Sequence, residues 1–151
     1  MKILLATDGT RFSNAALEIL LRFRLGENDW IRVISVVDLA LPTALDMYGG
    51  YLPDTSTLER DAKAAAMQVV EDARQRLATE FHSAASNLSV EVLFGSPERR
   101  VVEAAEEFGA DLIVIGSHGY NQWERLLLGS VSNSIVHHAP CSVLVARLPG
   151  E

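Results

Sequence analysis

The most informative part of the sequence is Asp111–Ser132, DLIVIGSHGYNQWERLLLGSVS. It begins with a continuous apolar run, Leu112–Ile115, which ends at Gly116. An unbroken apolar run is typical of a strand that is buried on both faces, as in a parallel sheet. After it come Gly119, nine further residues and then the sequence Gly129-Ser130-Val131-Ser132, where a helix is expected to begin. The pattern therefore predicts a buried strand, a glycine-containing loop and a helix start.

This strand–loop–helix pattern has the chemistry of a phosphate site. Glycines after a strand allow a ligand to approach the backbone without interference from a Cβ atom. The first turn of a helix offers unpaired N–H groups and the positive end of the helix dipole, where phosphates bind. The hydroxyls of Ser130 and Ser132 add donors at the same place. We therefore expect this segment to hold a polyphosphate.

The rest of the chain alternates between strand and helix patterns. Buried strands are predicted at Ile3–Thr7, Ile31–Val37, Val90–Phe94, Leu112–Ile115 and Val143–Ala146. Together with the helices between them, they predict the α/β class. The expected fold is a five-stranded parallel sheet sandwiched by four helices, Rossmann-like, with residues 1–151 as a single domain.

Helix boundaries follow from capping residues, glycines and prolines. We expect the first helix to be capped by Ser13 and to end before Gly26, and the second to run from Thr57 to about Ser86 with Ser56 and Glu59 as a capping box. The third should begin at Ser96-Pro97-Glu98 and close at Gly109, and the fourth should run from near Gly129 to before Pro140. The second helix carries one apolar stripe: Ala62, Ala65, Ala66, Val69, Val70, Ala73 and Leu77.

In open parallel sheets, ligands bind at the carboxyl ends of the strands. Here those ends carry Asp8-Gly9, Asp38, Gly95 and Gly116. The long segment 38–56 leaves the sheet at this same edge and is expected to cover a ligand, although an insertion without a role is an alternative. Asp8 is expected to contact the ligand rather than serve only as a turn residue, whereas Asp38 could do either.

Composition excludes several function classes. The net charge of −7 argues against binding to nucleic acid or to an anionic membrane, and only two lysines occur. No apolar stretch is long enough to span a membrane, and the N-terminus lacks the features of a secretory signal, so a cytoplasmic location is expected. The histidines and Cys141 are not spaced for a protein-held metal site.

The spacing Gly116-x2-Gly119-x9-Gly129-Ser130 resembles the ATP-binding branch of the universal stress protein family, and the likeness covers the whole chain. The opening ILLATDGT resembles the first strand of the family and its aspartate turn. FGSPERRVVEAAEEFGADLIVIGSHG resembles its third helix and fourth strand, and GSVSNSIVHHAPCSVLVAR its last helix and strand.

The resemblance implies a set of nucleotide contacts. By position, Asp8 would lie at the nucleoside end of ATP with Ala6 and Thr7 beside it, and Val37 would contact adenine through its backbone. The residues expected around the ribose and phosphates are Ile115, Gly116, His118, Gly119, Gly129, Ser130, Val131 and Ser132. The expected cofactor is ATP with Mg²⁺ or Mn²⁺, the cation being held by phosphate oxygens and water more than by protein carboxylates.

Three functions remain open. The first is an ATP-binding sensor or switch in a stress response, acting with a protein partner of unknown identity. The second is a slow ATPase or autophosphorylating enzyme that uses the same pocket. The segment has no Gly-Lys-Ser or Gly-Lys-Thr sequence, so it is not a P-loop, and no lysine near it could stabilise a transferring phosphoryl group. The third is an interaction module with an empty pocket. A homodimer through the exposed C-terminal strand is also expected.

Overall fold

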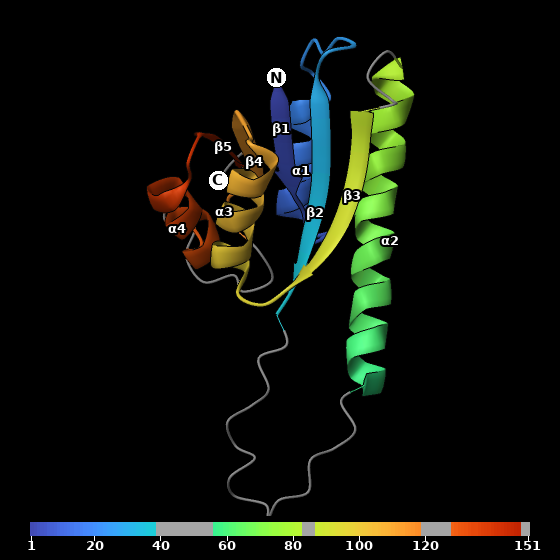
Figure 1. The fold of residues 1–151 in the computed structure, drawn as a ribbon, viewed down its shortest axis with the longest axis vertical. Helices are drawn as coiled ribbons and strands as arrows, with labels where there is room; N and C mark the ends of the chain where they lie inside the picture. Colours follow the sequence, from blue (N-terminus) through green and yellow to red (C-terminus); the bar gives the residue numbers. More distant parts are fainter. Residues whose placement is uncertain (39–55, 83–86, 119–127, 149–151) are drawn as a thin grey trace, which may run out of the picture.

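The computed structural model describes residues 1–38, 56–82, 87–118 and 128–148. None of the helices in these ranges carries the long apolar stretch that a membrane span requires. The elements follow one another in the order β1 (Lys2–Ala6), α1 (Arg11–Leu20), β2 (Trp30–Val37), α2 (Ser56–Glu80), β3 (Leu88–Phe94), α3 (Pro97–Phe108), β4 (Leu112–Gly116), α4 (Ser130–His138) and β5 (Ser142–Ala146) (Figure 1).

The five strands form one parallel sheet in the order β3-β2-β1-β4-β5. The central strand β1 pairs with β2 through Ala6 and Ile34 on one side, and with β4 through Leu5 and Val114 on the other. The order reverses at β1, because β2 lies on one side of it and β4 on the other. This is the position at which open parallel sheets bind ligands. The predicted five-stranded parallel sheet sandwiched by four helices is confirmed.

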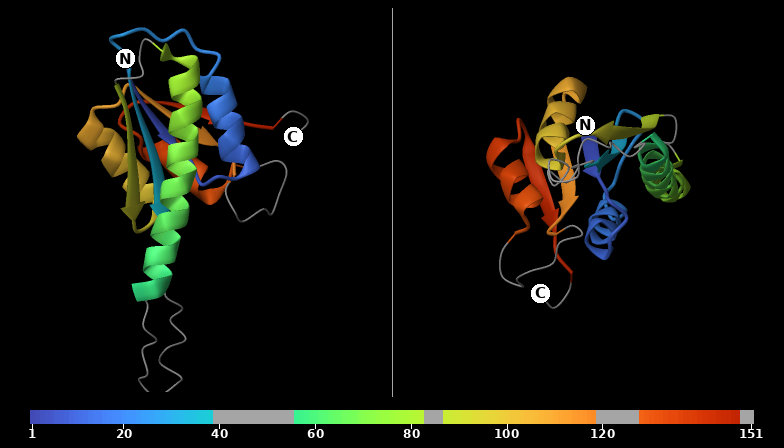
Figure 2. Two further views of the ribbon diagram at one scale, coloured as in Figure 1. Left: turned by 90° about the vertical axis from the view of Figure 1, so that its right-hand side faces the viewer. Right: turned by 90° about the horizontal axis from the view of Figure 1, so that it is seen from below.

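Two helices cover each face of the sheet (Figure 2). Alternate residues of a strand point to opposite faces, so Leu5 packs with Leu17 of α1 and Leu77 of α2, whereas Leu4 packs with Val101 of α3 and Ile135 of α4. All six side chains are at most 2 % exposed. The sheet is therefore buried on both faces, which explains why its central strands read as continuous apolar runs.

The helix boundaries agree with the sequence signals in α3 and α4 and differ in the other two helices. Gly109 closes α3 in the left-handed conformation, with φ of 65°, as a C-terminal glycine does. The expected cap of α1 was wrong: Thr10 is the N-cap, and Ser13 is a buried residue inside the helix. The second helix ends at Glu80, earlier than expected, and Phe81 turns into the core.

The apolar stripe of α2 is divided between two environments. Val70, Ala73 and Leu77 are buried against the sheet. The preceding part of the stripe, which includes Ala62 and Ala65, is not buried, because the first turns of α2 extend past the carboxyl end of the sheet (Figures 1 and 2). The single apolar stripe that the sequence predicted thus packs against the core in its second half, whereas its first half lies beyond the end of the sheet.

The last strand, β5, is at the edge of the sheet. Its residues Val143, Leu144 and Val145 are only partly buried. Ala146 accepts a hydrogen bond from the N–H of Ser117, at 2.8 Å, so its backbone groups point toward β4. Successive residues of a strand point their backbone groups to alternate sides, and those of Val145 therefore point away from the sheet.

Candidate functional site

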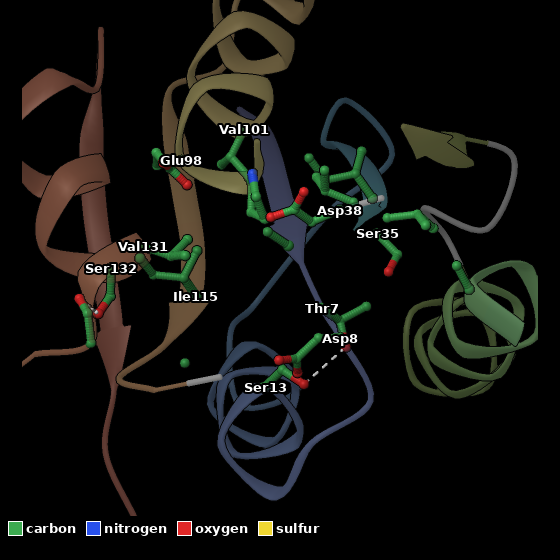
Figure 3. A pocket seen from close by; sticks show the side chains of 18 of the residues that line it. Thr7, Asp8, Ser13, Ser35, Asp38, Glu98, Val101, Ile115, Val131 and Ser132 are labelled. Carbon is green, nitrogen blue, oxygen red and sulfur yellow. Dashed lines mark hydrogen bonds between the residues drawn. The ribbon is translucent and has the colours of Figure 1, made fainter. Parts of the chain in front are cut away.

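A cleft of about 700 Å³ lies at the carboxyl ends of β1, β2 and β4 (Figure 3). The first turns of α2 form one wall through Ala62, Ala65, Ala66 and Val69. The opposite wall comes from the beginnings of α3 and α4. A volume of this size is within the usual range for small-molecule and cofactor sites.

The structure brings most of the expected contact residues together in this cleft. Those that line it are Ala6, Thr7, Asp8, Val37, Ile115, Gly116, His118, Gly129, Ser130, Val131 and Ser132. Gly119 lies outside the described residues, as does nearly all of the expected covering segment 38–56. The contacts of these residues with a nucleotide remain predictions.

The beginning of α4 faces the cleft. Gly129 is the N-cap and offers no side chain, and among the described residues no side-chain cap hydrogen bond is made at this end of the helix. The first turn also contains no acidic residue. Ser130 is exposed and lines the cleft. The unpaired N–H groups and the helix dipole therefore face the cleft without a competing carboxylate on the same helix.

Ser132 has a different role from Ser130. Its side chain is 3 % exposed, and its hydroxyl donates to the backbone carbonyls of Ser117, at 2.8 Å, and Gly129, at 3.0 Å. The N–H of Gly129 donates to the same Ser117 carbonyl, at 2.9 Å. The Ser132 hydroxyl thus joins the end of β4 to the start of α4. The expected phosphate donors at this end are reduced to the Ser130 hydroxyl and the backbone N–H groups.

Asp8 shapes the turn between β1 and α1. Its Oδ1 accepts hydrogen bonds from the N–H of Thr10, at 3.0 Å, and from the Thr10 hydroxyl, at 2.7 Å. The side chain also lines the cleft and is only partly buried. Asp8 therefore has the turn role and also lies in the cleft, so the two readings of this residue do not exclude each other.

Gly116 is needed for the packing of α1 against β4. A Cβ atom at this position would lie 2.6 Å from the carbonyl carbon of Phe12 and 2.8 Å from the N atom of Ser13. Real Cβ atoms do not approach backbone this closely, so α1 can rest on the end of β4 only because residue 116 has no side chain. The glycine that the sequence assigned to ligand access also fixes the position of α1.

The backbone that faces the cleft from β2 belongs to Val36 rather than Val37. The carbonyl of Val37 accepts from the N–H of Gly95, at 3.1 Å, and so points toward β3. The carbonyl of Ile34 accepts from Thr7 on the opposite side, at 2.9 Å. Because backbone groups alternate along a strand, those of Val36 point to the side where β1 has ended. Sequence reasoning placed the open backbone one residue too late.

Three buried hydroxyls lie on the face of the sheet that α1 and α2 cover. Thr7 donates to the Ser13 hydroxyl at 3.1 Å, and Ser13 donates to the Thr10 carbonyl at 3.1 Å (Figure 3). Ser35, on β2, is the third member and lines the cleft. Sequence reasoning missed Ser13 and Ser35 as cleft residues, because a serine within an apolar pattern carries no local signal of the side that it faces.

The charges around the cleft are mainly negative. Asp8, Asp38 and Glu98 line it, and its described lining residues include no lysine or arginine. The ring of His118 lies 5.2 Å from that of Phe12, and its Nδ1 is 3.1 Å from the Ser117 hydroxyl. In the part of the chain that the structure describes, no three His, Cys, Asp or Glu side chains are arranged to hold a metal ion.

Comparison with known proteins agrees with this architecture. The model of the universal stress protein family matches residues 1–147. A universal stress protein of Methanocaldococcus jannaschii is 31 % identical over 148 residues, which are 98 % of this chain and 82 % of that protein. The structure of the protein MJ0577 superimposes with a TM-score of 0.82 and 23 % identity, covering 99 % of this chain and 97 % of that one.

Two similar structures contain nucleotides. A universal stress protein family member from Arabidopsis thaliana with AMP bound has a TM-score of 0.68 and 17 % identity, over 99 % of this chain and 93 % of that one. A universal stress protein in complex with cAMP has a TM-score of 0.64 and 20 % identity, over 97 % and 96 %. At these identities the likeness shows the fold alone. From the match over nearly its full length, the chain belongs to the universal stress protein family.

Proposed function

We propose that the cleft binds ATP and that the protein acts as a nucleotide-dependent sensor in a stress response. The observation that carries the proposal is the open start of α4, where Gly129 caps the helix without a side-chain partner and Ser130 is exposed at the cleft. Such a helix start favours phosphate. The AMP and cAMP that two similar structures contain support an adenine nucleotide as the ligand.

The two ends of the cleft suit the two ends of the nucleotide. The Val36 N–H and carbonyl offer a donor and an acceptor beside the gap where β1 ends, as a base edge requires. Ala62 and Ala66 of α2 provide a small, apolar wall next to it. The phosphates would then extend past Asp8 toward Ser130 and the first N–H groups of α4.

A divalent cation is expected to accompany the phosphates. Asp8, Asp38 and Glu98 would repel a polyphosphate, and the described lining residues supply no lysine or arginine to offset them. Mg²⁺ prefers phosphate oxygens and water, and it is usually bound with few protein ligands. We therefore expect Mg²⁺ or Mn²⁺ to arrive with ATP rather than to occupy a site of its own.

Ser130→Asp tests the phosphate end directly. An acidic residue in the first helical turn is favourable for the helix, so the variant should fold at least as stably as the wild type. The same charge should repel the phosphates and weaken ATP binding at least tenfold, or about 1.4 kcal/mol, in titration calorimetry. Adenosine, which has no phosphate, should bind both proteins equally.

The matched control is Asn133→Asp. Asn133 is exposed on the same helix and does not line the cleft, so this variant adds an equal charge one turn away. Its affinity for ATP should stay within about twofold of the wild type. Equal weakening by the two variants would indicate a general charge effect and would remove the phosphate assignment. Mass spectrometry of the nucleotide released on denaturing the purified protein identifies the ligand independently.

We further propose that ATP is held rather than rapidly turned over. Fast phosphoryl transfer requires positive charge concentrated around the γ-phosphate. The described cleft residues offer backbone N–H groups, the Ser130 hydroxyl and His118, which suit binding of the ground state. A single-turnover assay with γ-labelled ATP decides the matter. Phosphate release faster than about one per second, lost in Ser130→Ala, would favour the ATPase alternative.

A homodimer through β5 is also proposed, in a cytoplasmic protein that signals through a partner of unknown identity. The backbone groups of Val145 point outward from the edge strand, and a second copy of β5 could satisfy them. Val145→Pro removes the outward donor and leaves the hydrogen bonds to β4 intact. Light scattering should show a dimer for the wild type and a monomer for the variant. A wild type that is already monomeric at tens of micromolar would exclude this dimer.

A further inference from the structure

Ser35 combines deep burial with an unused hydroxyl. Its side chain is 5 % exposed and lines the cleft. Within residues 1–38, 56–82, 87–118 and 128–148, the Ser35 hydroxyl has no hydrogen-bond partner, and the only unpartnered side-chain atom that is sealed from solvent is Nε of Arg100. The Ser35 oxygen is therefore not sealed in the core. Figure 3 shows it pointing into the cleft.

The neighbouring hydroxyls are satisfied within the protein. The pairing of Ala6 with Ile34 places Thr7 beside Ser35 on the next strand, on the same face of the sheet. The Thr7 hydroxyl accepts from the N–H of Gly9, at 3.3 Å, and donates to Ser13. Ser13 in turn donates to the Thr10 carbonyl. Thr7 and Ser13 thus use their hydroxyls to hold the β1–α1 turn, whereas the neighbouring Ser35 hydroxyl remains available.

An unpaired hydroxyl in a buried position is unfavourable unless a ligand or water pairs with it. Ser35 is adjacent to Val36, whose backbone N–H and carbonyl face the gap beyond β1. The wall opposite is the alanine face of α2, which includes Ala62 and Ala66. One donor–acceptor pair, one further hydroxyl and a flat apolar wall fit a planar heteroaromatic group with a polar edge. Ser130 and the start of α4 belong to a different element, on the other face of the sheet.

We propose that the Ser35 hydroxyl hydrogen-bonds the nucleobase of the bound nucleotide and is a specificity-determining residue of this cleft. This inference rests on the proposed nucleotide-binding function and adds to it a contact on the face of the sheet opposite to α4. Ser35 reads the base together with the Val36 backbone. The phosphates are bound elsewhere, so the contribution of Ser35 is independent of them.

The test is Ser35→Ala, measured by titration calorimetry with three ligands. The loss of one neutral hydrogen bond should weaken ATP and adenosine by the same factor, about fivefold. Inorganic tripolyphosphate, which has no base, should bind the variant and the wild type equally. The variant should melt at the wild-type temperature, because the hydroxyl has no protein partner to lose.

A fourth ligand separates a base contact from a ribose contact. If Ser35 reads the base, Ser35→Ala should weaken 2′,3′-dideoxyATP by the same factor as ATP. A loss that disappears with the dideoxy compound would assign Ser35 to the ribose and overturn the proposal. The matched control is Ser13→Ala, which removes a hydroxyl with protein partners. It should lower the melting temperature by about 2–4 °C.

Failure of the inference and failure of the proposed function give different results. If wild-type protein binds no adenine nucleotide, the proposed function is wrong and the Ser35 contact falls with it. If the wild type binds ATP and Ser35→Ala binds it equally well, the Ser35 contact alone is wrong. Should Ser35→Ala not fold, Ser35→Cys decides, because a thiol of similar shape is only a weak donor and should show the same loss.

Discussion

Polar groups are paired differently at the two ends of the strands. We call the end where the strands begin the amino edge of the sheet, and the end where they stop the carboxyl edge. At the amino edge, polar groups pair with one another over long sequence distances. The N-terminal ammonium donates to Asp29 at 2.7 Å, the N–H of Lys2 donates to Asp111 at 2.7 Å, and Asn87 donates to the carbonyls of Glu27 and Asp29. At the carboxyl edge, the backbone of Val36, the hydroxyl of Ser35 and the start of α4 face the cleft without such partners.

The difference shows which edge is built for stability and which for a ligand. Pairing between distant residues closes the amino edge and holds the strands in register. Unpaired donors at the other edge lower stability unless something binds there. Substitutions of the paired polar groups at the amino edge should therefore change unfolding alone, whereas substitutions of the unpaired polar groups at the carboxyl edge should change binding. Four measurements test this contrast.

The largest effect is expected from Gly116→Ala. The new methyl group would meet the backbone of Phe12 at 2.6 Å, and α1 would have to move. Overpacking against backbone should lower the free energy of unfolding by about 3 kcal/mol. Thermal and denaturant unfolding measure it. The control is Gly26→Ala, where nothing lies within 4 Å of the added atom and the change should stay within about 0.5 kcal/mol. Equal stability of the two variants would show that the packing of α1 against β4 does not require glycine at position 116.

The second effect is stabilisation by ATP. A ligand present at 100 times its dissociation constant should stabilise the folded state by about 2.7 kcal/mol. The melting temperature with and without MgATP measures it. Asp29→Asn, at the amino edge, should leave this increment unchanged, whereas Ser130→Asp should reduce it at the same ATP concentration. An increment that falls equally in both variants would contradict the division of roles between the two edges.

The third effect concerns the turn that carries Asp8 into the cleft. Thr10 caps α1, and its hydroxyl donates to the Asp8 carboxylate. Thr10→Ala should lower the free energy of unfolding by about 1 kcal/mol, as the loss of a helix cap does. Thr10→Ser keeps the hydroxyl and should restore most of the stability. ATP affinity should also fall in the alanine variant, because Asp8 loses one of the hydrogen bonds that position it. Wild-type stability in Thr10→Ala would show that the Thr10 cap contributes little to the free energy of unfolding.

The smallest effect is expected at Asp29. Its hydrogen bond with the N-terminal ammonium, assisted by the N–H of Gly26, lowers the pKa of this carboxyl below its usual value of 3.8. The stabilisation is therefore present above pH 3.8 and is lost as the pH falls through the lower pKa of the folded state. Asp29→Asn should cost about 0.5 kcal/mol near pH 6, and this difference from the wild type should shrink below pH 3.8. A difference that persists unchanged at pH 2.5 would exclude the ion pair as its cause.

Local signals predicted the elements and the order in which they alternate. Apolar runs such as Leu112–Ile115 are buried strands, and Pro97 and Gly109 bound α3, because caps and breakers act within a few residues of themselves. Ser13 was misread as a cap for a tertiary reason. The Thr10 hydroxyl donates a hydrogen bond to Asp8 in the turn before α1. The Ser13 hydroxyl instead points into the protein, where it accepts a hydrogen bond from Thr7.

The site prediction was incomplete where it depended on the positions of neighbouring elements, which a local sequence pattern does not encode. The alanines of α2 read as one core stripe, because the sequence does not say where the sheet beneath the helix ends. Whether Val36 or Val37 presents its backbone to the cleft depends on where β1 stops relative to β2. Ser35 reads as an interruption in an apolar strand until the position of its neighbour Thr7 is known.

The hydrogen bonds that the Ser117 carbonyl accepts from Gly129 and Ser132 have a consequence for how this chain can diversify. They tie together the two ends of the eleven residues between Ser117 and Gly129, so the start of α4 keeps its place whatever length of chain connects it to β4. Doubling that length would add only about 0.6 kcal/mol of closure entropy. Insertions here should therefore cost less folding stability than insertions within any strand, but they would change the Gly119-x9-Gly129 spacing on which the proposed phosphate site depends. The proposed ligand, rather than the fold, would then limit the length of this segment.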